Sequence, residues 1–423
     1  MRFEDLELIK PLLKALEDEK YEVPTSVQEK AIPHILKRRD VLGSAQTGTG
    51  KTAAFAIPIL QHLYQDRQNQ NSPRKINALI ITPTRELAIQ IGESFSTYGK
   101  YTGLKNTVIF GGVNQTAQIR RLRSGVDILV ATPGRLLDLM DQNYIRLNHI
   151  EYFVLDEADR MLDMGFIHDI RRIIAKLPGK RQSLFFSATM PKNIVDLSRK
   201  ILNNPVKVEV SPVSSTAETI QQYLYYTNKS TKKDLLQHIL KDRKMDQVLL
   251  FCKTKHGADR IVRNLFKQKV SAAAIHGDKS QNQRQKALGK FKDGEIRVLV
   301  ATDIAARGID INKLKYVINY DIPNIAETYV HRIGRSGRAG DEGVSISICE
   351  PEENDWIRDI EKLIDQKIEI ITDNPFPQTD RPMTASEKQE FEKEKLLRKQ
   401  EYFANRHKNQ KRPDKSHSGR QKK

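Results

Sequence analysis

Short apolar runs alternate with amphipathic stretches along most of the chain. In the first half, runs rich in Val, Ile, Leu and Phe lie at residues 41–44, 78–82, 107–110, 127–130, 152–155 and 183–186. Each run is short and continuous, as expected for strands buried on both faces of a parallel sheet. Between them apolar residues recur at helical spacing, for example Leu87, Ile91 and Phe95 within residues 85–98. The alternation predicts an α/β fold in which helices cover parallel sheets.

This alternation stops once and then restarts. Residues 204–218 contain two prolines and a Ser/Thr cluster, which is typical of a linker. Strand-like runs then resume at residues 247–252, 270–275, 298–302, 316–320 and 344–349, with helical patterns such as 233–240 and 259–266 between them. We therefore expect two tandem α/β domains, residues 1–205 and 219–372, joined by a linker at 206–218.

The composition changes again after residue 372. Pro375, Pro377 and Pro382 interrupt regular structure, and most later residues are Lys, Arg, Gln, Asn and Ser. Such a segment buries too little apolar surface to offset the entropy lost on ordering. Residues 373–423 are predicted to form a basic tail that is disordered on its own, with a transient helix at 386–400.

Composition excludes several classes of protein. No run approaches the roughly 18 apolar residues of a membrane span, and residues 1–10 carry acids where a signal peptide needs a basic start. Cys252 and Cys349 are too few for a disulfide framework or a cysteine-based zinc site. These features predict a cytoplasmic protein.

The formal net charge is +18, from 71 Lys and Arg against 53 Asp and Glu. Residues 381–423 hold 14 basic and 6 acidic side chains, a net charge of +8. An excess of this size favours a polyanionic partner, either a nucleic acid or an anionic surface. A Lys-rich solvated surface is the alternative, so charge alone does not decide the partner.

Residues 45–52 read AQTGTGKT and lie between a predicted strand and a predicted helix. Gly48 and Gly50 permit a tight turn whose backbone N–H groups point at phosphate oxygens. Lys51 supplies a mobile positive charge to the β- and γ-phosphates, and the Thr52 hydroxyl can bind Mg²⁺. A strict P-loop pattern has glycine where this chain has Ala45, and the alternative is a Gly-rich turn without a ligand.

A second acidic feature follows the apolar run YFVL at 152–155. Asp156 and Glu157 come directly after it. One carboxylate there can hold Mg²⁺ through its water shell, and the other can activate an attacking water. An acidic pair after a strand is otherwise a solvated loop, but a P-loop in the same domain favours the catalytic interpretation.

The sequence DEAD at 156–159 is the signature of the DEAD-box ATP-dependent RNA helicases, which this chain resembles from about Phe3 to beyond Arg338. Eleven motifs occur in the family's order. They are YEVPTSVQ (21–28), AQTGTGKT (45–52), PTRELA (83–88), GG (111–112), TPGR (132–135), DEAD (156–159), SAT (187–189), LLFCKT (249–254), QNQR (281–284), ATDIAARGID (301–310) and HRIGRSGR (331–338). The short amino-terminal lead and the last two motifs resemble the bacterial RhlE-type branch.

This resemblance implies two RecA-like domains that close on ATP, Mg²⁺ and single-stranded RNA. The first would hold the P-loop, with the Q motif within residues 1–29, and the second would be the helicase C-terminal domain. Arg335 and Arg338 match the family's arginine fingers, whose planar fixed charge suits the transition-state oxygens. The implied catalytic residues are Lys51, Asp156, Glu157, Arg335 and Arg338, with Thr52 and Asp156 (through water) at the metal.

Adenine recognition is implied for Gln28, because a glutamine amide can pair with the N6 and N7 edge of the base. Tyr21 and Phe3 match aromatic positions that can stack on it, with core packing as the alternative for Tyr21. Lys20 and Ser26 replace the family's usual Gly and Pro, but neither position supplies the base-reading group. The implied nucleotide-binding residues are Phe3, Tyr21, Gln28, Ala45, Gln46, Thr47, Gly48, Thr49, Gly50, Lys51, Thr52, Gly308 and Asp310.

Two further sets follow from the resemblance. Coupling between the domains is implied for Asp159, Ser187, Thr189, Asp303, His331 and Arg332. RNA contacts are implied for Pro83, Thr84, Arg85, Gly111, Gly112, Thr132, Pro133, Gly134 and Arg135 in the first domain and Thr254, Gln281, Arg284 and Thr302 in the second. Contacts of this kind reach phosphates and carry no sequence information.

The leading functional hypothesis is an RNA-stimulated ATPase that separates short RNA duplexes, or remodels RNA–protein complexes, independently of sequence. A nucleotide-gated RNA clamp or scaffold needs the same site, and a DNA-translocating helicase is a further alternative. The basic tail, which contains Phe391, Tyr402 and Phe403, is predicted either to capture RNA by charge and stacking or only to aid solubility. We expect a monomer, with ribosome-assembly or RNA-decay partners possible and no membrane.

Overall fold

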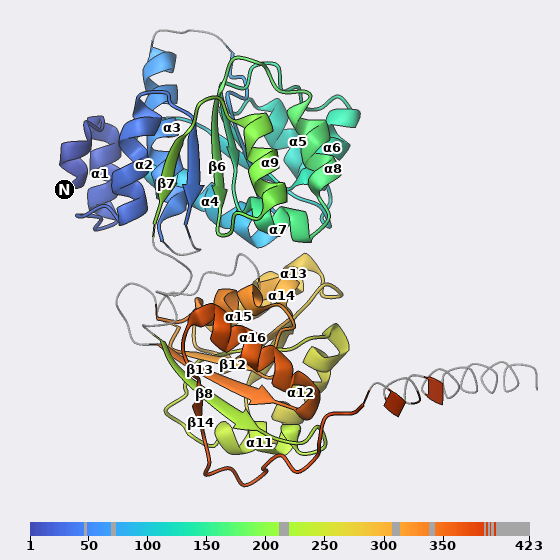
Figure 1. The fold of residues 1–423 in the computed structure, drawn as a ribbon. Helices are drawn as coiled ribbons and strands as arrows, with labels where there is room; N and C mark the ends of the chain where they lie inside the picture. Colours follow the sequence, from blue (N-terminus) through green and yellow to red (C-terminus); the bar gives the residue numbers. More distant parts are fainter. Residues whose placement is uncertain are drawn as a thin grey trace, which may run out of the picture.

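The computed structural model describes residues 1–45, 49–68, 73–210, 220–306, 314–337, 343–384, 386–387, 390 and 393–394. These residues form two α/β lobes, one above the other in Figure 1, and α13, α14 and α15 of the second lobe lie on the side facing the first. No helix among them is both long and apolar enough to cross a bilayer.

The first lobe contains a seven-stranded parallel sheet in the order β3-β4-β2-β5-β6-β1-β7. Its strands are β1 (Val41–Ser44), β2 (Ala78–Ile81), β3 (Asn106–Ile109), β4 (Ile128–Ala131), β5 (Tyr152–Leu155), β6 (Gln182–Ser187) and β7 (Val206–Glu209). Its helices are η1 (Phe3–Leu6), α1 (Lys10–Asp18), α2 (Ser26–Leu36), α3 (Lys51–Gln68), α4 (Arg85–Tyr98), α5 (Thr116–Arg123), α6 (Pro133–Asp141), α7 (Ala158–Asp163), α8 (Ile167–Ile174) and α9 (Lys192–Ile201).

The second lobe repeats this arrangement with the order β10-β11-β9-β12-β13-β8-β14. Its strands are β8 (Ile220–Tyr226), β9 (Val248–Phe251), β10 (Ala272–Ile275), β11 (Val298–Ala301), β12 (Tyr316–Asn319), β13 (Gly343–Cys349) and β14 (Glu369–Ile370). Its helices are α11 (Lys232–Ile239), α12 (Lys255–Lys267), α13 (Gln281–Lys292), α14 (Asp303–Ala306), α15 (Ala326–Ile333), η2 (Pro351–Glu353) and α16 (Asn354–Ile364).

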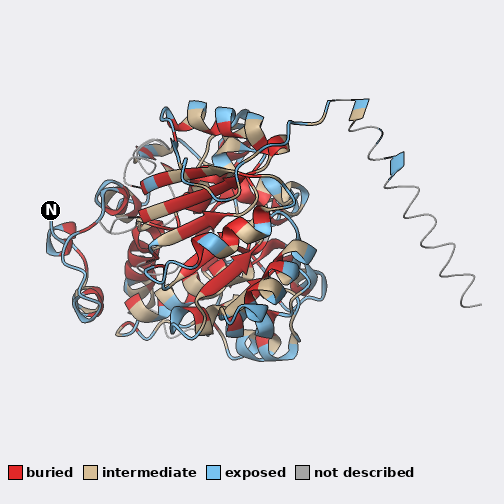
Figure 2. Cartoon of the chain, turned by 90° about the horizontal axis from the view of Figure 1, so that it is seen from below, coloured by how far each residue is buried: buried red, intermediate tan, exposed pale blue. Residues whose placement is uncertain are grey.

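Helices cover both faces of each sheet, so the strands are buried on both sides. On β2, Ala78 and Ile80 pack into the cluster with α1 to α4, whereas Leu79 and Ile81 pack into the cluster with α6 to α9. Figure 2 shows the buried strands between helices whose outer faces are exposed. Two-sided burial explains why these strands read as continuous apolar runs, and it confirms the predicted fold class.

Two predicted boundaries were wrong. The linker expected from residue 206 begins later, because Val206–Glu209 is β7 and pairs with β1; residues 211–219 lie outside the described residues. The tail expected from residue 373 also begins later. The carbonyl of Phe376 accepts a 2.7 Å bond from the Thr227 hydroxyl, and Asn228 donates 2.7 Å to Thr379. Residues 371–384 thus form a strap along the second lobe, and most of 385–423 lies outside the described residues.

Candidate functional site

The loop between β1 and α3 lies at the carboxyl end of the first sheet. The Ala45 N–H donates to the Ser187 carbonyl over 3.2 Å, which fixes the exit of β1. Lys51 opens α3, is buried, and its Nζ donates to the Ala45 carbonyl over 2.8 Å. This lysine therefore lies inside the turn, as the P-loop prediction requires. Gln46, Thr47 and Gly48 were predicted to bind phosphate and lie outside the described residues.

Gln28 is built into the same turn. Its Oε1 accepts the Thr25 N–H (2.9 Å), which caps α2, and its Nε2 donates to the Gly50 carbonyl (3.1 Å). The Thr25 hydroxyl donates to the Thr49 carbonyl (2.8 Å). Among the described residues these bonds use one of the two hydrogens of the Nε2 amide. The sequence predicted the adenine role of Gln28, but it did not reveal this support of the loop.

Phe3 and Tyr21 stack on each other, with ring centroids 6.3 Å apart and an interplanar angle of 24°. Phe3 is buried in the core of the first lobe, whereas Tyr21 is 41% exposed. A hollow of about 760 Å³ lies beside both rings. Of the two rings, only that of Tyr21 is open enough to stack on a ligand, and Phe3 supports it from below.

The acidic residues after β5 are almost completely buried. Burial raises the pKa of Asp156 to about 6, although the Lys51 charge partly opposes the rise. Burial also acts on Glu157, but the positive charges of Arg160, Lys51 and Arg335 outweigh it and lower the pKa of that carboxyl. Arg160 donates to Glu157 Oε2 over 3.0 Å. Glu157 therefore carries its negative charge at neutral pH, as an activating base must.

Glu157 has a left-handed backbone, with φ of 56°. This conformation turns the chain sharply between β5 and α7, and it places Asp156 and Glu157 on the same edge of the sheet. Such a conformation is uncommon for a residue with a Cβ and is typical of functional turns. The Glu157 N–H also donates to Asp156 Oδ1 over 3.0 Å, which fixes the orientation of the Asp156 carboxylate.

Asp159 joins this acidic turn to the end of β6. Its Oδ2 accepts the Thr189 N–H (2.9 Å), the Thr189 hydroxyl (3.0 Å) and the Ala188 N–H (3.2 Å). Its own N–H donates to the Ser187 hydroxyl over 3.2 Å. The structure thus brings the predicted coupling residues Asp159, Ser187 and Thr189 together in one hydrogen-bonded unit.

The second lobe presents α15 to this unit. Burial, and next the neighbouring Arg160 charge, lower the pKa of His331 to about 4, while Asp159 and Glu157 raise it and Arg335 lowers it. His331 and Arg335 of the second lobe are therefore close to the acids of the first. Arg335 is a predicted catalytic residue and lies where the cleft closes. Arg338, Gly308 and Asp310 lie outside the described residues.

Arg332 and Asp303 act within the second lobe. The guanidinium of Arg332 donates to both oxygens of Asp303 (2.6 and 2.8 Å) and to the Asp321 carbonyl (2.6 Å). It also lies over the Phe251 ring at 5.1 Å. The pair was predicted to couple the lobes, but the contacts described here orient α15 inside its own lobe.

A groove of about 480 Å³ runs between the lobes. Its first-lobe walls include the predicted RNA-contact residues Pro83, Thr84, Arg85, Gly111, Thr132, Gly134 and Arg135, and its second-lobe walls include Gly277, Arg284 and Ala305. Pro133 opens α6 beside them, and Gly112, with φ of 77°, leaves no room for a Cβ against the Arg85 guanidinium. Glycine at this position therefore lets the Arg85 guanidinium approach the main chain closely.

Glu86 bridges the two lobes and was missed by sequence reasoning. Its Oε1 accepts the Gln281 amide (3.0 Å), and its Oε2 pairs with Arg284 (3.1 Å). Arg85 donates to Gln281 over 3.5 Å. The available indication in the sequence was an acidic residue in PTRELA (83–88), the motif with the predicted RNA contacts. A carboxylate at this position needs a positively charged partner from elsewhere in the fold.

Thr254 and Thr302 follow β9 and β11, beside the groove but not among its lining residues. Thr254 accepts the Gly257 N–H over 3.0 Å and so caps α12. Thr302 precedes α14, and its carbonyl accepts the Ala305 N–H over 2.9 Å. Both mark helix starts, where backbone N–H groups are available to phosphates.

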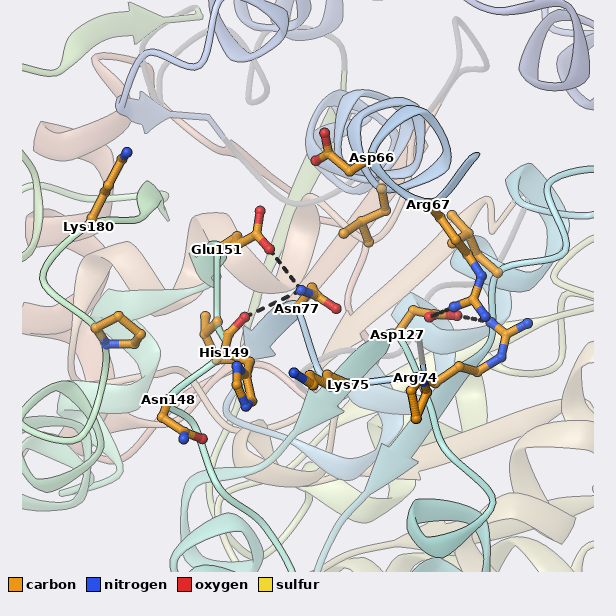
Figure 3. Close-up of a pocket in the computed structure, with 15 residues that line it drawn as sticks. Asp66, Arg67, Arg74, Lys75, Asn77, Asp127, Asn148, His149, Glu151 and Lys180 are labelled. Carbon is orange, nitrogen blue, oxygen red and sulfur yellow. Dashed lines mark hydrogen bonds and ion pairs between the residues drawn. The ribbon is translucent and has the colours of Figure 1, made fainter. Parts of the chain in front are cut away.

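Another hollow, of about 340 Å³, lies at the amino ends of β2, β4 and β5. Asp156 and Glu157 lie at the opposite, carboxyl end of these strands. Figure 3 shows Asp127 beside Arg67 and Arg74 and Asn77 beside Glu151, whereas no dashed line joins Lys75 or Lys180 to another residue. Asp127 pairs with both arginines, and Asn77 donates to Glu151 over 2.8 Å. The two acids Asp127 and Glu151 are therefore already engaged.

The residues present fit a hydrated Mg²⁺ ion. Thr52 and Asp156 supply the hard oxygen ligands that Mg²⁺ prefers, and the raised pKa of Asp156 shows a buried carboxylate that a divalent cation would stabilise. Within the described ranges, no cluster of three or more His, Cys, Asp or Glu forms a metal site. A site with few protein ligands is what Mg²⁺ on nucleotide phosphates requires.

Two tandem RecA-like lobes, with a P-loop and paired acids facing basic residues across a cleft, define a two-lobed P-loop ATPase. The DEAD/DEAH box helicase model matches residues 25–197, and the helicase conserved C-terminal domain model matches residues 231–340. The chain belongs to the DEAD-box family of RNA helicases.

The chain is similar to the ATP-dependent RNA helicase CshA of Limosilactobacillus reuteri, with 44% identity over 363 residues, 86% of this chain and 72% of that protein. It is 43% identical to the RNA helicase CrhR of Synechocystis over 88% of this chain and 74% of that protein. Among solved structures, S. cerevisiae Dbp5 bound to RNA and ADP BeF3 has a TM-score of 0.77 at 31% identity, covering 88% of this chain and 95% of that one.

Proposed function

We propose that this protein is an ATP-dependent RNA helicase in which RNA and ATP together close the two lobes. The observation that carries the proposal is that the lobes meet through Glu86, Gln281 and Arg284. In this arrangement the charge of Arg335 from the second lobe lowers the pKa of the buried Glu157 in the first. The catalytic site is thus complete only when the lobes meet. The RNA-bound state of the similar Dbp5 structure supports RNA as the ligand of the groove.

The chemistry follows from the positions of the side chains. Lys51 and the backbone of the loop after β1 hold the β- and γ-phosphates, while Gln28 reads the adenine edge. Thr52 and Asp156 would hold Mg²⁺, which neutralises phosphate charge and orients the leaving group. Glu157 activates the attacking water. Arg335, together with Arg338, stabilises the charge that develops on the γ-phosphate.

RNA binds along the groove through its backbone. Arg85, Arg135 and Arg284 supply positive charge, and the glycines let the phosphates approach the main chain. Contacts of this kind do not read bases, so unwinding is independent of sequence. One strand that fits the closed groove but not a regular duplex would be bent out of its partner, which opens short duplexes locally.

The testing experiment compares ATP turnover without polynucleotide, with single-stranded RNA, and with single-stranded DNA of the same sequence. RNA is expected to raise turnover at least tenfold over both other conditions. Arg335→Ala should remove this stimulation. Arg171→Ala, at an exposed position of α8, should leave it unchanged. Equal turnover without RNA would contradict the proposal.

A nucleotide-gated RNA clamp is the second candidate, because the interlobe contact of Glu86 with Gln281 and Arg284 could hold a closed state without strand separation. Glu157→Gln separates the two. A helicase loses strand displacement with this change. A clamp retains RNA longer on the substituted chain, and its wild type displaces no strand from a short duplex.

Finer assignments complete the proposal. We infer a cytoplasmic monomer of the RhlE-type branch. Two buried free cysteines support a reducing compartment, and the motifs at 301–310 and 331–338 support the branch, although the similar proteins reported above carry the names CshA and CrhR. The ATP-binding lobe extends through Val210 and the second lobe starts at Ile220. The predicted site residues outside the described ranges keep their proposed roles, and ribosome-assembly or RNA-decay complexes are the proposed partners.

A further inference from the structure

The two sheets correspond strand by strand, so residues after equivalent strands occupy equivalent places. β8 takes the place of β1, and β12 takes the place of β5. Lys51 opens the helix after β1, and Lys232 opens α11 after β8. By strand register, Asn319 ends β12 where Leu155 ends β5, so Asp321 corresponds to Glu157. The second lobe therefore has a lysine and an acid where the first has Lys51 and Glu157.

In the second lobe this lysine is bound by acids of its own chain. Its Nζ lies 3.0 Å from Glu353, 3.2 Å from Asp321 and 3.8 Å from Glu350. The Lys232 side chain is only 3% exposed. Carboxylates thus take the place that phosphates have in the first lobe, and a buried charge with three such partners is firmly fixed.

The carboxylates around Lys232 hold the turn between β12 and α15. Asp321 accepts the Lys253 N–H over 2.7 Å through its other oxygen. Glu353 accepts the Ile322 N–H over 3.0 Å. The carbonyl of Asp321 accepts the Arg332 guanidinium over 2.6 Å. The lysine therefore fixes, through two acids, the backbone that leads into α15.

That backbone reaches the nucleotide cleft through Arg332. The Arg335 N–H donates to the Arg332 carbonyl over 3.2 Å, so the position of one arginine depends on the other. Arg332 sits at the end of α15, which also carries His331. A continuous set of contacts thus joins Lys232 to Arg335, whose charge lowers the pKa of Glu157 in the first lobe.

We propose that Lys232 is a positioning residue for ATP hydrolysis, which holds Asp321 and thereby places Arg335 in the closed cleft. The inference rests on the proposed function, because Arg335 matters only if the lobes close on ATP. Lys232, which opens the helix after β8 as Lys51 does after β1, would thus support hydrolysis in the cleft without contacting ATP.

Steady-state turnover of the full chain at saturating poly(U) and Mg²⁺-ATP tests this. Lys232→Met should lower kcat about fivefold and leave the KM for ATP within about twofold, because the ATP-binding loop lies in the other lobe. Lys232→Arg should recover at least half of kcat. Lys233→Met, on the exposed side of the same helix, is the matched control and should match wild type.

A double-substitution cycle separates positioning from a general loss of structure. In an Arg335→Lys background, which keeps the charge but not the fork, Lys232→Met should lower kcat little further, because both changes affect the same contact. Full additivity would overturn the inference. Thermal unfolding of each variant, with the assay well below the midpoint, shows that the chains compared are folded.

If Lys232→Met does not fold, Glu353→Gln is measured in its place. Glutamine can still accept the Ile322 N–H, but the change removes one of the negative charges around Lys232. A kcat about twofold lower supports the inference, and an unchanged kcat overturns it. A wild type that RNA does not stimulate overturns the proposed function and this inference together. A stimulated wild type with an equally active Lys232→Met overturns the inference alone.

Discussion

Arg160 and Glu157 form the most deeply buried ion pair of the catalytic region, each with 3% of its side chain exposed. Removing one partner of such a pair leaves the other charge buried without compensation, which costs far more than loss of a surface pair. The pair also keeps Glu157 ionised, because the Arg160 charge offsets the effect of burial on its pKa. Stability and catalysis therefore depend on the same contact.

Arg160→Met should lower the free energy of unfolding of the first lobe by about 3 kcal/mol. Urea denaturation followed by circular dichroism measures the change. Arg172→Met removes an exposed pair with Asp141 (3.4 Å) and should cost less than about 0.5 kcal/mol. Equal unfolding midpoints for the two variants would contradict the assignment of a buried pair.

His331 gives the closed cleft a pH dependence. Its pKa is about 4 when buried and returns toward 6.5 when the lobes part. The open form therefore binds more protons between these values, so closure is fully favoured above pH 6.5 and weakens as the pH falls toward 4. Arg160 and Arg335 lower the pKa of His331 by their charge, and Asp159 and Glu157 raise it.

RNA-stimulated turnover should accordingly fall between pH 7 and pH 5.5. His331→Asn should make this fall shallower and leave the part that comes from Asp156, whose pKa of about 6 lies in the same range. Initial rates at saturating RNA and ATP across this range provide the measurement. His149→Asn, an exposed residue at the distal hollow, should keep the wild-type profile. An identical pH dependence in His331→Asn would mean that another group controls closure.

Among the elements, the connection from α2 to the loop before α3 is tightly constrained at Gly50. Gly50 has φ of +93°, and a Cβ there would lie 2.4 Å from Gln28 Nε2 and 2.8 Å from the Thr25 hydroxyl. Neither group can move without breaking the bonds that join α2 to the loop. Glycine is therefore required for both the backbone conformation and the close approach.

Gly50→Ala should raise the KM for ATP at least tenfold and reduce the preference for ATP over GTP, because Gln28 is displaced from the base edge. Gln28→Ala should give the same loss of preference. Gly179→Ala, where a Cβ would meet nothing within 4 Å, is the control and should not change either parameter. Competition between ATP and GTP in one turnover assay measures the preference directly.

The sequence predicted most strands to within two residues, because buried parallel strands are apolar on both faces. It missed the edge strand β7, the strand β8, which lies between β13 and β14, and the two-residue edge strand β14. In β7 and β8 buried and more exposed positions alternate, so neither is a continuous apolar run. Side chains of the phosphate and acidic motifs were predictable because their chemistry is local. Glu86 and Lys232 were not, since their partners lie about 195 and 90 to 120 residues away.

For the whole molecule, net charge and its location govern the capture of RNA. Residues 381–423 carry a net charge of +8 out of +18. Attraction to phosphates by such a segment is nonspecific and weakens steeply with salt. Its contribution should therefore appear in affinity, and not in the rate of a chain that is already saturated with RNA.

Truncation after Thr384 keeps the strap, whose Met383 N–H donates to Glu352 over 2.6 Å. The shortened chain should bind single-stranded RNA at least threefold more weakly at 50 mM salt, with kcat at saturating RNA nearly unchanged. Fluorescence anisotropy at several salt concentrations measures the affinity and its salt dependence. Unchanged affinity would show that the segment only aids solubility.

β14 and the strap together cover an edge of the second sheet. β14 pairs with Tyr223 and Leu224 of β8, the Ile371 N–H donates to the Leu224 carbonyl, and Asn374 donates to the Tyr226 carbonyl over 2.8 Å. These bonds occupy main-chain groups that would otherwise recruit a strand from a neighbouring molecule. A chain that ends before residue 369 would leave the main-chain groups of β8 unpaired at this edge of the sheet. We expect such a chain to aggregate at high concentration by strand pairing between neighbouring molecules.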